Sequence, residues 1–163
     1  NLCKKLNIIM GTLSKAVASL GGYVSGDADL INYLRNKARP FMYTTALPPA
    51  VCAASIAGIN LIQEDPSMRE SLWYNVRFIK DKLRSLNINM ISSESQIIPI
   101  LIGDAQKAVE ISKFLYKRGI LIPAIRPPTV PINSSRLRMT VMSTHTKDDL
   151  ERLLEALSEV KGF

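Results

Sequence analysis

The sequence is poor in the residues that build most metal and redox sites. Its 163 residues include one histidine, two cysteines and one tryptophan. A single histidine, His145, excludes most metal sites built from several imidazole ligands. Cys3 and Cys52 lack the spacing of a metal or redox pair, and we expect Cys52 to be a buried small hydrophobe. The sequence therefore argues against a metal centre built on histidines and a redox site built on cysteines.

Long apolar runs and runs of like charge are also missing. The most apolar segment, residues 46–62, is interrupted by two prolines, whereas a membrane-spanning helix needs about twenty apolar residues. With no secretory leader and no disulfide pattern, we expect a cytoplasmic protein. The net charge of +7 comes from basic residues interleaved with acids, without a nucleic-acid-binding motif. An anionic cofactor and an acidic substrate fit this charge at least as well as nucleic acid.

The first motif with chemical content is a lysine in a polar turn. Residues 11–16 read Gly-Thr-Leu-Ser-Lys-Ala, after an apolar segment at residues 6–10 and before the pair Gly21-Gly22. The hydroxyls are suited to hold a phosphate beside the Lys15 amine. Because the ordinary lysine pKa is about 10.4, a site must lower it to make the amine a nucleophile. The alternative is a solvated surface lysine, and the spacing is not that of a P-loop.

A second motif combines prolines with alternating arginines. Residues 125–131 read Ile-Arg-Pro-Pro-Thr-Val-Pro, which forbids a helix and predicts a stiff extended segment. Arg136, Arg138 and Thr140 then alternate with apolar residues, as on one face of a strand. Arginine can grip a carboxylate through two parallel hydrogen bonds. On these residues alone, a solvated strand face is the simpler interpretation.

A third segment, residues 35–49, carries the adjacent hydroxyls of Thr44 and Thr45. Thr45 precedes an apolar helix that Pro48 is expected to begin, so it is a candidate N-cap as well as a candidate anion ligand. The two roles are compatible, because a helix N-terminus attracts negative charge.

Together the three segments resemble the α-oxoamine synthases, a family of pyridoxal-phosphate enzymes. The resemblance implies an α/β protein of the fold-type-I pyridoxal-phosphate transferases, similar to aspartate aminotransferase. The Arg-Pro-Pro-Thr-Val-Pro sequence favours the branch that condenses L-alanine with a pimeloyl thioester, of coenzyme A or an acyl carrier protein, in biotin biosynthesis. The resemblance covers only the second half of a family member. We therefore expect a C-terminal fragment, inactive alone, of an enzyme that is a homodimer when full-length.

The resemblance also implies roles for individual residues. Lys15 matches the catalytic lysine that forms a Schiff base with pyridoxal 5'-phosphate, and Thr12 matches a ligand of the cofactor phosphate. Thr45 matches a residue that reaches the cofactor phosphate of the neighbouring subunit. Thr129 and Arg138 match substrate-binding positions, with Arg138 on the carboxylate of the amino acid. No metal is implied.

Three alternatives stay open. The first is another α-oxoamine synthase (a glycine C-acetyltransferase, a 5-aminolevulinate synthase or a serine palmitoyltransferase-like enzyme), because these residues encode the acyl donor poorly. The second is a non-catalytic protein that keeps only the fold, against which stands the presence of Lys15 and Arg138 together. The third is a nucleic-acid-binding domain, which rests on charge alone and predicts steeply salt-dependent binding.

Periodicity predicts a chain that alternates strands and helices. We expect residues 1–66 to be the C-terminal part of a large cofactor-binding domain, residues 67–87 a bridging helix and residues 88–163 a small C-terminal domain. The predicted helices cover residues 28–39, 48–63, 67–86, 105–118 and a closing segment capped by Thr146. The predicted strands cover residues 6–10, 23–25, 97–102, 120–125 and the arginine strand. The alanine-rich helix over residues 48–63 is expected to be buried, and His145 to make a structural hydrogen bond.

Overall fold

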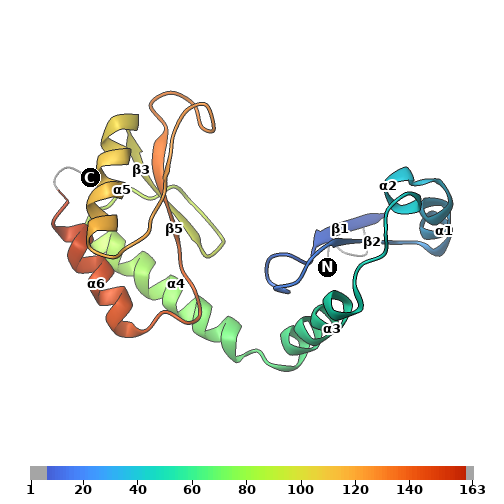
Figure 1. Cartoon of the computed structure of the whole chain (residues 1–163). Helices are drawn as coiled ribbons and strands as arrows, with labels where there is room; N and C mark the ends of the chain where they lie inside the picture. Colours follow the sequence, from blue (N-terminus) through green and yellow to red (C-terminus); the bar gives the residue numbers. More distant parts are fainter. Residues whose placement is uncertain (1–6, 161–163) are drawn as a thin grey trace. The chain divides into compact units, whose positions relative to one another are not determined.

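The computed structural model describes residues 7–160 (Figure 1). The chain divides into two compact units, Asn1–Pro66 and Ser67–Phe163. Both contain strands and helices, in agreement with the α/β class. The assignment of the units to a large and a small domain, and the bridging role of residues 67–87, stay predictions. Cys3 and the start of the strand predicted at residue 6 lie outside the described residues.

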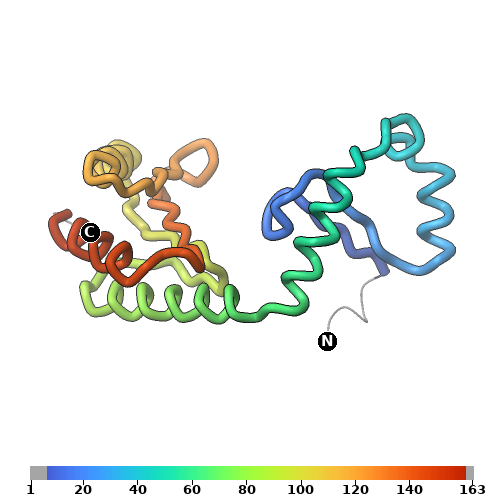
Figure 2. Tube along the Cα trace, turned by 60° about the horizontal axis from the view of Figure 1, so that its bottom comes forward, coloured from blue at the N-terminus to red at the C-terminus, as the bar shows by residue number. Residues whose placement is uncertain are grey.

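The first unit opens with an antiparallel hairpin. Strand β1 (Ile8–Thr12) pairs with β2 (Gly22–Gly26), and the turn between them carries Lys15. β1 continues two residues beyond the end predicted at residue 10. Helices α1 (Ala28–Lys37), α2 (Arg39–Met42) and α3 (Pro49–Glu64) follow along the chain, as the tube in Figure 2 shows.

The single helix predicted over residues 28–39 is wrong at its C-terminal end. α1 stops at Lys37, and Ala38 has an extended backbone with ψ 101 before α2 begins. Pro40 explains the break, because inside a continuous helix it would lack an N–H donor and its ring would clash with the carbonyl of Asn36. In α2 it occupies the first turn, where no intrahelical donor is needed.

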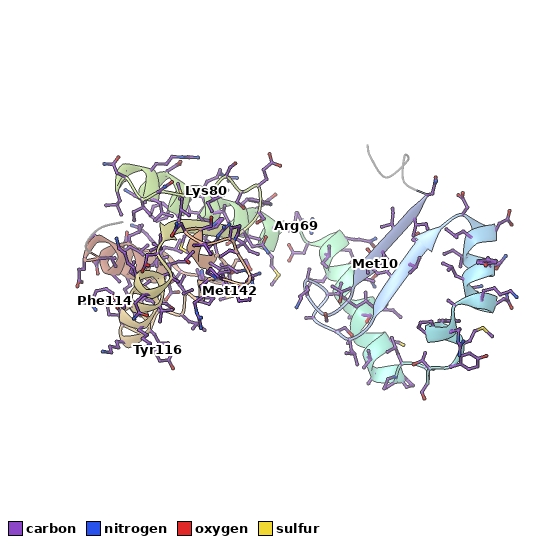
Figure 3. All side chains as sticks on the ribbon, turned by 90° about the horizontal axis from the view of Figure 1, so that it is seen from above. Met10, Arg69, Lys80, Phe114, Tyr116 and Met142 are labelled. Carbon is purple, nitrogen blue, oxygen red and sulfur yellow. The ribbon has the colours of Figure 1, made fainter. Side chains whose placement is uncertain are left out.

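Burial in the first unit is slight. Among its described side chains, only Ser55 on α3 is buried. The prediction of a buried α3 is therefore wrong in this chain: Ile56 is 62% exposed and Leu61 is 50% exposed. Cys52, predicted to be buried, is exposed too. The contacts of α3 with the rest of the unit include Val51, Ser55 and Gly58, whereas most of its other side chains are exposed. Figure 3 shows the side chains of the unit, with Met10 labelled on β1.

The second unit combines three helices with a three-stranded antiparallel sheet. In chain order it contains α4 (Ser67–Ser85), β3 (Ile97–Gly103), α5 (Ala105–Lys117), β4 (Ala124–Ile125), β5 (Ser135–Thr140) and α6 (Lys147–Ser158). The strand order is β3-β5-β4. α5 contacts all three strands, and α6 lies beside α4 in both views (Figures 1 and 2).

The core of the second unit follows the periodicity of its sequence. α4 buries Val76, Ile79 and Leu83, which share one helix face because they are three or four residues apart. On β5, Leu137 and Met139 are buried whereas Arg138 between them is exposed, so the predicted alternation is confirmed. The remaining core residues come from β3, α5, α6 and the loops: Ile88, Ile98, Ile100, Ile111, Leu115, Ile122, Val141, Leu150, Leu153, Ala156 and Leu157.

Two element boundaries of this unit test the sequence predictions. Gly119 ends α5 as predicted, with φ +78 and its N–H donating to the Tyr116 carbonyl at 2.9 Å. The strand predicted over residues 120–125 is shorter than expected, because only Ala124–Ile125 pairs with β5.

No helix in the described part of the chain has both the length and the apolar character to cross a membrane.

Candidate functional site

The turn that carries Lys15 is closed by backbone hydrogen bonds. The Leu13 N–H donates to the Gly21 carbonyl, and the Ser19 N–H donates to the Leu13 carbonyl, each at 2.9 Å. The Ala18 N–H donates to the carbonyl of Lys15 at 2.9 Å, and Ala18 has a positive φ of 54°. Lys15 thus belongs to a defined turn, with its own side chain exposed.

Two hydroxyls of this turn precede the lysine. Thr12 Oγ1 lies 2.7 Å from Ser14 Oγ and accepts the Ser14 N–H at 3.1 Å. It also donates to the Gly21 carbonyl at 3.3 Å, which leaves the 2.7 Å contact to be donated by Ser14. Thr12 and Lys15 are therefore brought together in one turn. In this arrangement both hydroxyl hydrogens are used within the turn, so a hydroxyl would donate to a phosphate only after turning from its present acceptor toward the anion.

The segment of Thr45 passes next to the same turn. A Cβ added at Gly21 would lie 3.0 Å from Leu47 Cδ1, so the two segments are close, and the φ of +100 at this position favours glycine. Thr45 itself is exposed. The N-cap alternative for Thr45 is wrong, because the N-cap of α3 is Pro48 and no side chain caps that end. An anion-binding role for Thr45 stays a prediction.

Arg138 lies on the exposed face of β5 in the second unit. Its N–H donates to the Pro123 carbonyl at 2.9 Å, which fixes the strand beside the segment that leads into β4. It lines a hollow of about 490 Å³ together with His145, Asp149 and Arg152. Within residues 7–160, no ion pair engages the guanidinium of Arg138. The group is therefore free to bind a carboxylate.

Thr129 lies in the proline segment between β4 and β5. Its N–H donates to the Arg126 carbonyl at 3.1 Å, and its side chain is exposed. The Ile125–Arg136 pair brings both ends of the segment together at the sheet. Thr129 and Arg138 therefore both belong to the second unit, whereas Lys15 belongs to the first.

A buried amide organises the turn that follows β5. Asn75 on α4 donates from Nδ2 to the carbonyls of Met142 and His145 at 3.1 and 3.0 Å. His145 Nδ1 accepts the Met142 N–H at 3.2 Å, which confirms the expected structural hydrogen bond. The sequence interpretation missed Asn75. Its signal was a polar residue beside the apolar stripe of α4.

The hollow beside Arg138 is bounded by the N-terminus of α6. Thr146 caps the helix as predicted, accepting the Asp149 N–H at 3.2 Å. The Asp149 carboxylate in return accepts the Thr146 N–H at 2.9 Å and its hydroxyl at 2.8 Å. These two hydrogen bonds hold the pKa of Asp149 below its ordinary value, and the bond from the Thr146 backbone N–H has the larger effect. The positive charges of His145 and Arg152 lower the pKa by smaller amounts.

The described residues offer no metal centre. No group of three or more His, Cys, Asp and Glu side chains in residues 7–160 is arranged to hold an ion. The chemistry available in the first unit is a lysine amine in the same turn as two hydroxyls, and in the second a guanidinium at the edge of a hollow.

Comparisons with known proteins agree on one family. The family model described as "Aminotransferase class I and II" matches residues 1–157. An 8-amino-7-oxononanoate synthase of Thermoanaerobacter pseudethanolicus is 44% identical over 160 residues, which is 98% of this chain and 40% of that protein. One from Bacillus velezensis is 43% identical over 153 residues, 94% of this chain and 39% of that protein. The chain thus spans about 40% of the length of these curated relatives.

Solved structures share the fold. A Sphingomonas wittichii serine palmitoyltransferase matches with a TM-score of 0.90 at 26% identity, covering 96% of this chain and 40% of that one. An 8-amino-7-oxononanoate synthase from Francisella tularensis matches with a TM-score of 0.82 at 27% identity, covering 93% of this chain and 44% of that one. The fold-type-I prediction is confirmed by these matches. The chain belongs to the class I and II aminotransferase family.

Proposed function

We propose that the chain is the Lys15-bearing part of an 8-amino-7-oxononanoate synthase. The enzyme would condense L-alanine with a pimeloyl thioester, of coenzyme A or an acyl carrier protein, with loss of carbon dioxide. The observation that carries the proposal is the identity of 44% over 160 residues to a curated relative of that name. The full-length enzyme would be a cytoplasmic homodimer, and its product would be a precursor of biotin.

Pyridoxal 5'-phosphate is the proposed cofactor, and the residues of the Lys15 turn fit it. The lysine amine is exposed, and the hydroxyls of Thr12 and Ser14 stand 2.7 Å apart a few residues before it. A serine palmitoyltransferase that was solved with pyridoxal phosphate as its internal aldimine matches this chain with a TM-score of 0.90. When bound, the cofactor supplies an electron sink for the carbanion formed at the substrate Cα. Lys15 would bind it covalently, and Thr12 would bind its phosphate.

The remaining steps are assigned to this chain's own side chains. The Lys15 amine, once free, would act as the base that removes the Cα proton of alanine, so the group that holds the cofactor also moves the proton. The Arg138 guanidinium would bind the alanine carboxylate through paired hydrogen bonds. Thr129 would contact the substrate, and Thr45 would donate to the cofactor phosphate of the partner subunit.

A second function has a specific observation in its favour. The serine palmitoyltransferase matches with a TM-score of 0.90, above the 0.82 of the Francisella synthase. Sequence identity argues the other way, at 44% to the Thermoanaerobacter synthase against 26% to the palmitoyltransferase. Backbone similarity reports the shared fold, whereas the substrate depends on side chains, so we favour the oxononanoate synthase.

The test is a titration of the 163-residue chain with pyridoxal phosphate, followed by borohydride reduction and peptide mass mapping. We expect the reduced label at Lys15 in excess of every other lysine, and its loss in Lys15→Ala. Lys37→Ala, at the end of α1 in the same unit, is the matched control and should keep the label at Lys15. Labelling spread evenly over the lysines would contradict the assignment.

A chimera tests the substrates. The chain would replace the matching 160 residues of the Thermoanaerobacter relative, and the product would be assayed with alanine plus pimeloyl-coenzyme A and with serine plus palmitoyl-coenzyme A. We expect turnover with the first pair only, and none in the Lys15→Ala chimera. Preference for the second pair would establish the palmitoyltransferase alternative instead.

A further inference from the structure

Ser55 is the one described side chain that is buried in the first unit, and it is polar. Its Oγ lies 2.9 Å from Ser19 Oγ and 2.9 Å from the Val51 carbonyl, and Ser19 Oγ lies 3.0 Å from the same carbonyl. Ser19 belongs to the Lys15 turn, whereas Val51 and Ser55 belong to α3. The two hydroxyls therefore join the turn to the helix across 36 residues of sequence.

The number of hydrogens ensures a hydrogen bond between the turn and the helix. Each hydroxyl has a single hydrogen to donate, so two hydrogens serve three short contacts and one contact always lacks a hydrogen. Two of the three contacts, Ser19–Ser55 and Ser19–Val51, join the turn to the helix. At least one of these two therefore holds a hydrogen in every arrangement, and both do when Ser55 donates to Ser19 Oγ and Ser19 donates to the Val51 carbonyl.

A second anchor lies three residues further along α3. A Cβ added at Gly58 would lie 2.7 Å from the Val17 carbonyl oxygen and 3.1 Å from its Cγ1. Only glycine allows this approach, since real Cβ atoms do not come within 3.0 Å of a backbone oxygen. Ser55 and Gly58 share one face of α3 because they are three residues apart. Val17 and Ser19, two and four residues after Lys15, rest on that face.

We propose that Ser55 and Gly58 are positioning residues, which clamp the Lys15 turn onto α3 through Ser19 and Val17. The inference rests on the proposed role of Lys15. Lys15 is proposed both to bind a cofactor and to remove a substrate proton. The rate of such a reaction falls when the backbone of the lysine moves away from the productive position, so a restraint on its turn favours catalysis. In a unit with so little buried surface, local packing alone does not provide this restraint.

Amide hydrogen exchange of the 163-residue chain tests the clamp without any cofactor. Ser55→Ala removes one net hydrogen bond and should raise exchange of the Leu13, Ala18 and Ser19 amides about fivefold. Ser19→Ala also loses the contact to the Val51 carbonyl and should raise exchange further, and adding Ser55→Ala to it should change little because the Ser19–Ser55 contact is already lost. Gly58→Ala keeps both hydroxyls but should also speed exchange in the turn. Ser55→Thr keeps the hydroxyl and should restore protection.

Ser25→Ala is the matched control, an exposed serine on β2 in the same unit. It should leave the turn unchanged. The clamp is refuted if Ser55→Ala speeds exchange equally over the whole first unit, if it changes nothing, or if the turn of the unaltered chain exchanges like an unfolded peptide.

Borohydride labelling with pyridoxal phosphate adds the functional readout. Ser55→Ala should lower the ratio of label at Lys15 to label at Lys37, and Ser55→Thr should restore it. Absence of selective labelling in the unaltered chain would contradict the proposed function, while the exchange data would still decide whether the clamp exists.

Discussion

The two units of this chain hold themselves together in different ways. The second unit has a continuous apolar core to which α4, α5, α6, β3 and β5 contribute buried side chains. The first buries a single described side chain, and large apolar residues on it are open, with Met10 77% exposed and Phe41 63% exposed. Backbone hydrogen bonds and a few side-chain contacts therefore define the first unit, whereas hydrophobic burial defines the second.

This contrast matters because each unit carries residues to which a role is proposed. Lys15 lies in the unit with little burial, and Arg138 lies on a strand backed by a closed core. Burial of apolar surface is the dominant favourable term in folding. The strand that carries Arg138 is thus expected to be rigid within its own unit, and the turn that carries Lys15 to depend on specific hydrogen bonds and close contacts.

The largest expected effect comes from separating the units. A peptide of residues 67–163 should unfold cooperatively with heat, because it keeps the whole described core. A peptide of residues 1–66 should show no cooperative transition. Circular dichroism of both during a thermal scan makes the measurement. A sharp transition in residues 1–66 would show that local contacts suffice there, and the contrast would be lost.

Core substitutions measure the same contrast residue by residue. Ile100→Ala, at 0% exposure on β3, should cost about 3 kcal/mol of unfolding free energy through lost burial and a cavity. The matched change in the first unit is Ile56→Ala, at 62% exposure on α3, which should cost less than about 0.5 kcal/mol. Urea unfolding of the chain compares the two. Equal losses would mean that Ile56 is covered in solution.

The Lys15 turn contains a strained backbone position, and a glycine there would relieve the strain. Ala18 has φ 54°, a left-handed conformation in which its Cβ is strained. Ala18→Gly should stabilise the closed turn by about 1 kcal/mol, seen as slower exchange of the Ser19 amide. Ala16→Gly, in the same turn without a positive φ, should have no such benefit. Faster exchange of the Ser19 amide in Ala18→Gly would mean that the entropy that glycine loses when the turn closes outweighs the strain that it relieves.

The smallest effect concerns the capping box of α6. The folded pKa of Asp149 is lowered by its hydrogen bonds with Thr146. Its contribution is therefore complete above the ordinary pKa of about 3.9 and is lost as pH falls through the lower folded value. Asp149→Asn should lower the melting temperature at pH 7, and its difference from the unaltered chain should vanish under acid.

Asp148→Asn provides the matched control for the capping box. Asp148 stands next to Asp149 in the first turn of α6 but is not part of the capping box. It should keep the acid-dependent loss of the unaltered chain. A difference between Asp149→Asn and the unaltered chain that persists below the pH at which Asp149 is protonated in the folded state would contradict the capping explanation.

Much of the fold could be predicted from short-range patterns. The alternation on β5, the stripe on α4, the end of α5 at Gly119 and the Thr146 cap each depend on residues within a few positions of one another. The Lys15 turn was located by its Gly-Thr-x-Ser-Lys sequence for the same reason. Side-chain period and local hydrogen bonding act over one or two turns of backbone, so the sequence contains them directly.

The sequence by itself thus determined the types of the main elements, the family and the identity of the candidate lysine, hydroxyls and arginine. Only the tertiary structure decided that Ser55 meets Ser19, that Asn75 holds the turn at His145, and that α3 is left open. It also decided that β4 pairs over only two residues. These features depend on contacts between residues tens of positions apart. Such contacts form only where the folded backbone closes the intervening loops, and no local pattern records which surfaces then meet.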